Sequence, residues 1–302
     1  MVVISILSSI MRRQDYRAST QDLSNKELYK IVIGEVKRRK NLQDTLAKVC
    51  LFDKKRTLSL MDIISDSVQP GMKGVDLGAG TGILGFAFLR AGGSYLYAVE
   101  HIRDLADLIE DVAAKLDFSS QIKVVREDAT TSKFDMNFDF VMSEMVDTGL
   151  SQEPIVSAII NIRKYVNPGV IYVPQAALSS ITILHGRKQL SAPVVYDNVS
   201  MANVSTCVNA MVEIPILKDG IADSARIDTK LIHPNGQETG RFRTLCYAVD
   251  VPLYFCVSEG DQKQTLFSKN RITRPIYEGQ KILVHINYQY GRSMIGCFTL
   301  IN

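Results

Sequence analysis

The sequence predicts an α/β domain with a doubly wound parallel sheet, followed by an antiparallel β domain. From residue 73 onward, short apolar strands alternate with helices at the spacing that produces a parallel sheet. After Pro174 the helical pattern stops, and short segments of alternating apolar and polar residues follow, as in an antiparallel sandwich or barrel. The length of 302 residues agrees with about two domains.

The elements can be placed in order along the chain. Ser24 and Glu27 have the spacing of a capping box, and the apolar stripe after them predicts a helix over 24–49. In the α/β part we expect strands at 73–77, 95–100, 121–125, 138–143 and 170–173, and helices at 83–91, 102–116 and 154–166. In the β part we expect strands at 178–184, 226–233, 243–249, 252–257, 281–289 and 294–301. The predicted divisions are an N-terminal extension and helix (1–50), the α/β domain (51–175) and the β domain (176–302).

The charge is small overall but unevenly placed. The net charge of +3 excludes a protein that coats nucleic acid through bulk positive charge. The first 60 residues nevertheless carry 13 Lys and Arg against 6 Asp and Glu, so a basic arm precedes a mildly acidic body. Its basic run, Lys37 to Lys40, is best explained as a solvated helix face, although the arm could also steer an acidic partner, including RNA.

Signals for targeting and for metal binding are weak. The five cysteines form no CxxC pair, which fits the reduced thiols of a cytoplasmic protein. The apolar residues 1–11 are too few to span a bilayer, so we expect no membrane anchor. These residues are interpreted as a flexible extension, or as a start upstream of the true one at Met11. No metal site is expected, because the four histidines have no partners at ligand spacing: His101, His185, His233 and His285.

The most informative stretch is the glycine turn VDLGAGTGIL, residues 75–84, between a strand and a helix. Glycines at alternate positions let the backbone turn sharply at the sheet edge where such folds bind ligands. The pattern Gly80-x-Gly82-x-x-Gly85 also satisfies the dinucleotide fingerprint. Asp76, however, would repel a pyrophosphate and suits a cationic group, such as the amino group of S-adenosyl-L-methionine. We therefore favour that cofactor over a dinucleotide.

Neighbouring strand ends supply further candidate cofactor ligands. The backbone at Gly78 and Gly80 would approach the cofactor closely. Glu100 ends the second strand and is placed to accept hydrogen bonds from both ribose hydroxyls. Asp128 and Ala129 follow the third strand and could bind the adenine amino group and ring edge.

The loop after the fourth strand, SEMVDTGLSQE, carries Glu144 and Glu153 nine residues apart. Both carboxylates would lie at the rim beside the cofactor crevice. Two converging glutamates form a strong cation site, because a guanidinium makes bidentate hydrogen bonds to carboxylates. Taken alone, the pair is equally consistent with two solvated loop carboxylates.

These motifs resemble those of the protein arginine methyltransferases over about residues 51–175, and more weakly to the end of the chain. The glycine turn and the later YAVE resemble the family's cofactor motifs, and NPGVIYVPQAAL resembles the segment that leads into its barrel. The loop from Glu144 to Glu153 resembles the family's double-glutamate hairpin. With Asp147 it is most similar to the loop of the monomethylating class. The segment Asp53-x-x-Arg56 resembles the one whose arginine binds the cofactor carboxylate.

The resemblance implies a Rossmann-like class I methyltransferase domain with a C-terminal antiparallel β-barrel-like domain. It implies S-adenosyl-L-methionine as cofactor, with Arg56 on its carboxylate, and methyl transfer to a guanidinium nitrogen of protein arginine. Glu144 and Glu153 would hold and polarise that guanidinium. The family also forms homodimers, although only 127 residues follow Gln175, few for a barrel and a dimerisation arm.

Two alternatives stay open. The first is an enzyme of the same fold that methylates RNA or a small amine. It is favoured because the family's Thr-His-Trp loop aligns with residues 260–262 of a chain without tryptophan. Asp261 in that segment is either a turn residue or a third anion on the substrate side. The second is a weakly active binding or scaffold homologue, because the family's aromatic pattern in the first helix is absent, with only Tyr16 and Tyr29 upstream.

Overall fold

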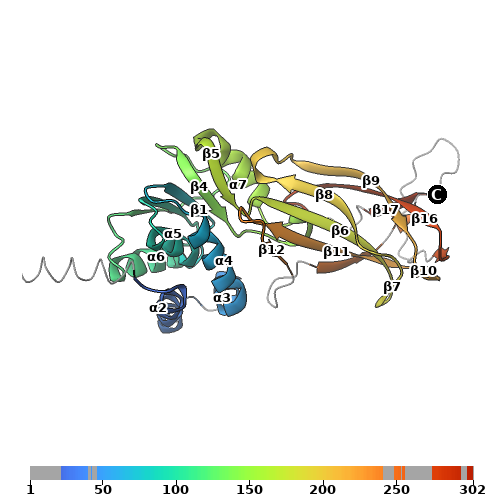
Figure 1. Ribbon diagram of the computed structural model, residues 1–302, viewed down its shortest axis with the longest axis horizontal. Helices are drawn as coiled ribbons and strands as arrows, with labels where there is room; N and C mark the ends of the chain where they lie inside the picture. Colours follow the sequence, from blue (N-terminus) through green and yellow to red (C-terminus); the bar gives the residue numbers. More distant parts are fainter. Residues whose placement is uncertain are drawn as a thin grey trace, which may run out of the picture.

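Two domains lie end to end in the computed structural model, which describes residues 22–39, 42, 46–240, 248–252, 254–255, 274–293 and 298–301 (Figure 1). The first contains a five-stranded sheet whose neighbouring strands are all parallel. The second is built from extended strands in mainly antiparallel sheets. The predicted succession of a parallel and an antiparallel domain is confirmed. Among the described residues, no helix is long and apolar enough to cross a membrane.

The parallel sheet has the strand order β3-β2-β1-β4-β5. Its strands are β1 Lys73–Leu77, β2 Tyr95–Val99, β3 Ile122–Val125, β4 Phe138–Ser143 and β5 Val166–Val173. The chain moves outward from β1 in one direction through β3 and in the other through β5. The strand order therefore reverses at β1, where an open α/β sheet forms its ligand crevice.

Helices cover both faces of this sheet (Figure 1). They are α4 Lys54–Ser67, α5 Ile83–Arg90, α6 Arg103–Lys115 and α7 Ile155–Ile162. Residues of α4, α5 and α6 share one core with side chains from one face of the sheet, while α7 shares a second core with side chains from the other face. Tyr97 and Val99 of β2 belong to the second core, and Leu96 and Ala98 to the first, as the alternation of side chains along a strand requires.

The first helix ends earlier than predicted. Helix α2, Asn25–Arg38, begins with the predicted capping box between Ser24 and Glu27, but the prediction of a single helix over 24–49 is wrong, because α2 ends at Arg38. Arg39 is the C-cap of α2 and has extended backbone angles, φ −92° and ψ 108°. The chain then forms α3, Leu46–Phe52. The predicted division between residues 50 and 51 falls inside α3, and residues of α2 and α3 share a buried cluster with α4 and α5.

The second domain begins three residues after β5 ends. Its strands are β6 Ala176–His185, β7 Lys188–Gln189, β8 Val194–Ser200, β9 Cys207–Pro215, β10 Gly220–Ala222, β11 Ser224–Ile232, β12 Glu238–Thr239, β13 Ala248–Pro252, β14 Tyr254–Phe255, β15 Arg274–Ile276, β16 Lys281–Gln289 and β17 Phe298–Ile301. β11 pairs with β6, β12 and β13, and β16 pairs with β9 and β17. We propose residue 175 as the boundary between the domains, since the last parallel and first antiparallel strands flank it.

The predicted β strands match the structure in part. The segments 178–184, 226–233 and 281–289 correspond to β6, β11 and β16. Only parts of the predicted strands 243–249, 252–257 and 294–301 lie within the described residues, where β13, β14 and β17 occur. The strands β8 and β9 were not predicted, although β9 alternates buried and exposed residues over much of its length. The buried residues of β8, Tyr196 and Val199, are three positions apart and do not follow the strand period.

Candidate functional site

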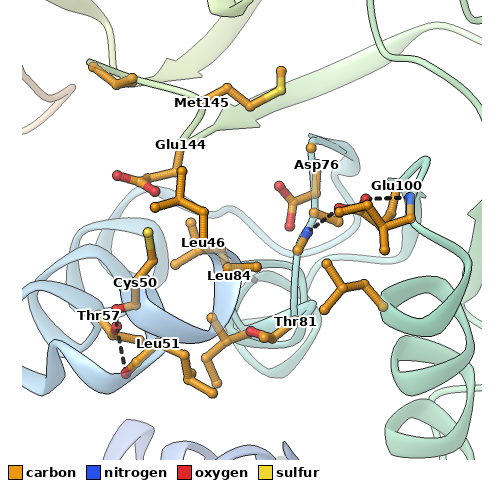
Figure 2. A pocket seen from close by; sticks show the side chains of 18 of the residues that line it. Leu46, Cys50, Leu51, Thr57, Asp76, Thr81, Leu84, Glu100, Glu144 and Met145 are labelled. Carbon is orange, nitrogen blue, oxygen red and sulfur yellow. Dashed lines mark hydrogen bonds between the residues drawn. The ribbon is translucent and has the colours of Figure 1, made fainter. Parts of the chain in front are cut away.

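A pocket of about 280 Å³ lies at the carboxyl ends of the parallel strands (Figure 2). Its walls come from the glycine turn, from α3 and α4, and from the loop that follows β4. Most of the predicted site residues line it: Arg56, Asp76, Gly78, Gly80, Glu100, Glu144 and Glu153. The candidate cofactor ligands and the two candidate substrate ligands therefore share one cavity.

The glycine turn has the backbone that only glycine adopts easily. Gly78, Gly80 and Gly82 have φ angles of 70°, 57° and 74°, in the left-handed region. The Gly78 amide donates to the carbonyl of Val99 at 3.0 Å, which holds the turn over the end of β2. A Cβ atom at Gly78 would lie 2.5 Å from Sδ of Met145. A side chain at this position would therefore force the side chain of Met145, which follows Glu144, to move.

Asp76 offers an unused carboxylate oxygen to this pocket. The residue is 2% exposed, and among the described residues its Oδ2 has no hydrogen-bond partner. Burial raises the pKa of Asp76 to about 7; the Gly85 amide, which lowers it, only partly opposes burial, and the charge of Glu100 raises it further. A buried acceptor without a donor is costly. A cationic ligand would remove that cost.

Glu100 is held in a fixed orientation by the backbone. Its Oε2 accepts from the Gly80 amide and its Oε1 from the Ile102 amide, each at 2.8 Å (Figure 2). The side chain is 5% exposed. Each carboxylate oxygen keeps a second lone pair, so Glu100 can still accept from two neighbouring hydroxyls.

Arg56 and Glu144 form an ion pair inside the pocket, through Nη2 and Oε1. Arg56 is a buried arginine, with 2% of its side chain exposed, whereas the Glu144 side chain is 16% exposed. Asp53 caps α4, because its carboxylate accepts a hydrogen bond from the Arg56 amide at 3.2 Å. This bond fixes the backbone of Arg56 in the first turn of α4. The two residues were predicted to bind different ligands, and the structure brings them into direct contact.

The second loop glutamate has an unusual environment. Burial raises the pKa of Glu153, and the neighbouring Asp147 raises it further. Asp147 organises this part of the loop, because its carboxylate accepts from the Ser151 hydroxyl at 2.9 Å and from the amides of Gln152 and Glu153 at 3.0 and 3.3 Å. Burial raises the pKa of Asp147 as well. The loop thus ends in a half-buried acid at the pocket wall.

Asp128 and Ala129 do not line the pocket. The Asp128 carboxylate accepts from the amide and hydroxyl of Thr130 at 2.8 and 2.7 Å, and these bonds lower the pKa of Asp128. Ala129 is buried, and its carbonyl accepts from Asn161 of α7 at 3.1 Å. Asp128 is nevertheless close enough to His101, which does line the pocket, for their charges to interact.

Several lining residues were not predicted. Leu46, Ala47 and Cys50 come from α3, while His101 follows Glu100 and Met145 follows Glu144. The sequence offers no metal-ligand partner for His101, which in the structure lines the pocket.

The remaining candidates lie elsewhere or outside the described residues. His233 is buried, with Nε2 2.7 Å from the Thr239 hydroxyl, and His285 lies 2.9 Å from the side chain of Asn209. Tyr16, residues 1–11 and the segment 260–262 with Asp261 are outside the residues that the structure describes. Within the described ranges, no group of three or more His, Cys, Asp or Glu could hold a metal ion.

Comparison with known proteins places this geometry in context. A family model described as Tellurite resistance protein TehB matches residues 51–183. The arginine N(omega)-methyltransferase of Streptomyces achromogenes subsp. streptozoticus is 29% identical over 142 residues, which cover 45% of this chain and 38% of that protein. Protein arginine N-methyltransferase 6 of Xenopus laevis is 31% identical over 108 residues, covering 35% and 32% respectively. These findings confirm the resemblance to the protein arginine methyltransferases.

The solved structure titled "Crystal structure of PRMT6-SAH" matches with a TM-score of 0.63 and 12% identity, over 84% of this chain and 97% of that one. At that identity the match shows the fold. It confirms a Rossmann-like domain followed by an antiparallel β-barrel-like domain. In sequence, the chain spans 38% and 32% of the lengths of the two curated relatives.

Proposed function

We propose that this protein is an S-adenosyl-L-methionine-dependent methyltransferase that transfers a methyl group to a guanidinium nitrogen of arginine in a protein substrate. The observation that carries the proposal is that candidate cofactor ligands and candidate substrate ligands line the same pocket. Asp76 and Arg56 can bind the charged ends of an amino acid, and Glu144 and Glu153 can bind a cation beside it. The names of the two curated relatives support arginine as the acceptor.

The residues of the pocket fit the cofactor. Asp76 Oδ2, buried without a donor, would accept from the ammonium group. The Arg56 guanidinium would bind the carboxylate, and Glu100, fixed by two amides, would accept from the ribose hydroxyls. We keep Asp128 and Ala129 at the adenine end, next to His101 and outside the enclosed volume. When bound, S-adenosyl-L-methionine supplies a methyl group activated by its sulfonium.

The chain's own contribution is positioning and charge. Glu144 and Glu153 would orient the substrate guanidinium and offset the positive charge that develops on it in the transition state. Because burial raises the pKa of Glu153, this carboxylate is a better base than an exposed glutamate and can accept the proton that the attacking nitrogen loses. Arg56, which neutralises Glu144 in the structure, would turn toward the cofactor carboxylate.

The test measures transfer of labelled methyl from S-adenosyl-L-methionine to four acceptors: an arginine-rich peptide, its lysine-substituted twin, free arginine, and RNA from the same cells. Label in the arginine peptide and recovery of methylarginine after hydrolysis are the expected result. Label confined to RNA or to free arginine would refute the protein acceptor. Cofactor binding without transfer to any acceptor, including a lysate, would favour a scaffold.

Variants test the assigned roles. Glu144→Gln should reduce transfer at least 100-fold with little change in cofactor affinity, whereas Glu213→Gln, an exposed glutamate on β9, should leave both unchanged. Arg56→Ala should weaken cofactor binding in calorimetry, and an unchanged affinity would contradict its role. A wild-type transfer rate in Glu144→Gln would contradict the proposed acceptor site.

The proposed compartment is the cytoplasm, and this proposal rests on the cysteine pattern alone.

A further inference from the structure

The loop between the two glutamates contains a strained backbone. Gly149 has φ 69°, and Leu150, a residue with a side chain, has φ 53° in the same left-handed region. Each left-handed residue other than glycine is disfavoured by about 1–2 kcal/mol. Leu150 is completely buried. This conformation turns the chain back toward the pocket between Glu144 and Glu153, so whatever holds it also sets how the two carboxylates are placed.

The β domain supplies what holds it. The Gly149 amide donates to the Thr229 hydroxyl of β11 at 2.7 Å, and the Gly149 carbonyl accepts from the Tyr288 hydroxyl of β16 at 2.9 Å. The Leu150 carbonyl accepts from the Gly291 amide at 3.0 Å. Thr229 and Tyr288 are 2% and 4% exposed. Both polar groups of the Gly149 backbone are therefore satisfied by side chains that follow it by 80 and 139 residues.

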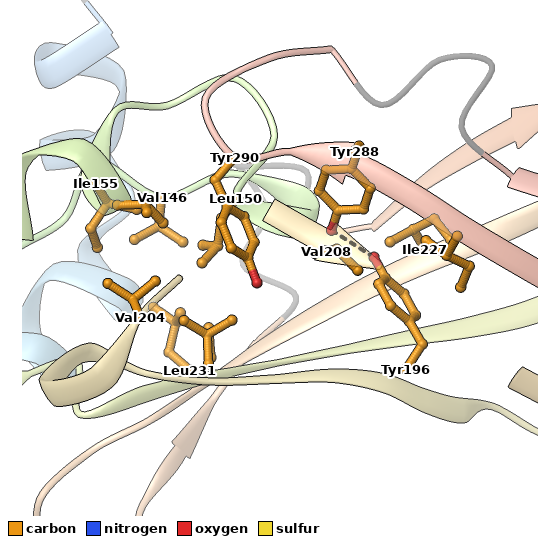
Figure 3. Close-up of a cluster of buried hydrophobic side chains, with 14 of the residues drawn as sticks. Val146, Leu150, Ile155, Tyr196, Val204, Val208, Ile227, Leu231, Tyr288 and Tyr290 are labelled. Carbon is orange, nitrogen blue, oxygen red and sulfur yellow. Dashed lines mark hydrogen bonds between the residues drawn. The ribbon is translucent and has the colours of Figure 1, made fainter. Parts of the chain in front are cut away.

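A second layer of hydroxyl groups supports these contacts. The Tyr288 hydroxyl lies 3.1 Å from that of Tyr196 in β8 (Figure 3), and the Thr229 hydroxyl lies 3.1 Å from that of Ser179 in β6. Since the single hydroxyl proton of Tyr288 is given to Gly149, Tyr196 must be the donor between the two tyrosines. Burial raises the pKa of Tyr288, which keeps that proton in place.

We propose that Tyr288 and Thr229 are positioning residues of the methyl transfer reaction, which hold the Gly149–Leu150 turn and thereby the spacing of Glu144 and Glu153. Neither residue lines the pocket. The β domain would thus control the geometry of the acceptor site from beneath the loop. This inference rests on the proposed function, because it assigns a role in that reaction.

The chain contains a matched control for Tyr288. Tyr290 is two residues further on, is 8% exposed, and packs against Tyr288 with ring centroids 6.0 Å apart. Its hydroxyl, however, donates to Asp197 of β8 at 2.6 Å rather than to the loop. Tyr288→Phe and Tyr290→Phe each delete one buried hydroxyl from neighbouring positions, but only the first loosens Gly149.

The experiment compares Tyr288→Phe and Tyr290→Phe with the wild-type protein, each as the whole chain. For Tyr288→Phe we expect kcat for the arginine peptide to fall about 10- to 100-fold, because a displacement near 1 Å can cost that much. The affinity for S-adenosylhomocysteine should stay within twofold. Hydrogen exchange in a peptide covering residues 147–153 should become at least fivefold faster. For Tyr290→Phe, kcat and exchange in that peptide should stay at wild-type values, at a similar loss of thermal stability.

Each outcome decides the matter. Equal effects of the two variants on kcat, or faster loop exchange in Tyr288→Phe without a loss of kcat, would overturn the inference. If Tyr288→Phe does not fold, Thr229→Val, which removes the acceptor of the Gly149 amide, takes its place with the same expected results. If the wild-type protein transfers no methyl group, the proposed function fails. Loop exchange then decides separately whether these side chains hold the turn.

Discussion

Substitution of Asp76 by asparagine should stabilise the free protein and weaken cofactor binding. The pKa of Asp76 is about 7 in the folded protein and near 3.8 in the unfolded chain. A carboxyl group with a raised folded pKa lowers stability as the pH rises from the unfolded value to the folded one. At 1.36 kcal/mol for each pH unit, the penalty reaches about 4 kcal/mol above pH 7. Asp76→Asn removes it, and the gain should shrink toward pH 4.

The same pKa predicts how binding depends on pH. If only ionised Asp76 binds the ammonium group, the apparent Kd scales with 1 + 10^(7 − pH), so binding should be about 15-fold weaker at pH 5.5 than at pH 7. The groups that bear on Asp76 are the Gly85 amide, whose bond favours the carboxylate, and Glu100, whose charge opposes it. Glu153 also titrates in the pocket, so the variant must be measured alongside the wild type.

The assay is calorimetric titration with S-adenosylhomocysteine between pH 5.5 and 7.5, with urea unfolding of both proteins at each pH. In Asp76→Asn the Kd should rise at least tenfold at pH 7, and most of its pH dependence should vanish. A variant that binds as well as the wild type, or that keeps the full pH slope, would refute the assignment of Asp76 to a cationic ligand group. Lower stability of the variant at pH 7.5 would contradict the raised pKa.

Three further predictions concern stability. Gly78→Ala should lower the free energy of unfolding in urea by at least 1–2 kcal/mol and abolish cofactor binding, because Gly78 has a φ of 70° and lies close to Met145. Gly34→Ala, in a helix with open space around it, should instead raise the free energy of unfolding by about 1 kcal/mol. Ser24→Ala removes the cap of α2 and should lower stability by about 1 kcal/mol; an unchanged midpoint would contradict this. Burial lowers the pKa of His233 to about 4, so the contribution of this residue to stability should fall by about 2 kcal/mol from pH 7 to 4.5, and the difference in stability between His233→Leu and the wild type should change by that amount over the same range.

The part of the site that could be predicted is the part built from adjacent strand ends. Asp76 lies near the end of β1, and Glu100 and Glu144 follow β2 and β4, which flank β1 in the sheet, so their side chains meet at one edge. Asp128 follows β3, the outermost strand and two places from β1. Its distance from the pocket is a consequence of strand order, which periodicity does not reveal.

Other features depend on contacts between distant segments. Arg56 could be recognised as a cofactor ligand by resemblance, but its pairing with Glu144, 88 residues later, depends on how the start of α4 meets the loop after β4. Neither glycine nor proline marks the end of α2 at Arg38, and the apolar stripe continues past it, so the sequence pattern does not reveal this boundary. By contrast, β9 could have been found, since Val208, Val212 and Ile214 are buried at alternating positions.

The second hydrophobic core crosses the proposed domain boundary without interruption. Val75 and Leu77 of β1 and Ile159 of α7 belong to the same buried cluster as Ile227 of β11 and Phe298 of β17. A fragment ending at residue 175 would expose this surface to water, at about 25 cal/mol for each Å² of apolar area. We therefore expect a single cooperative unfolding transition for the whole chain and aggregation of the isolated N-terminal part. The two domains can be distinguished by topology, but we expect them to fold and unfold together as one thermodynamic unit.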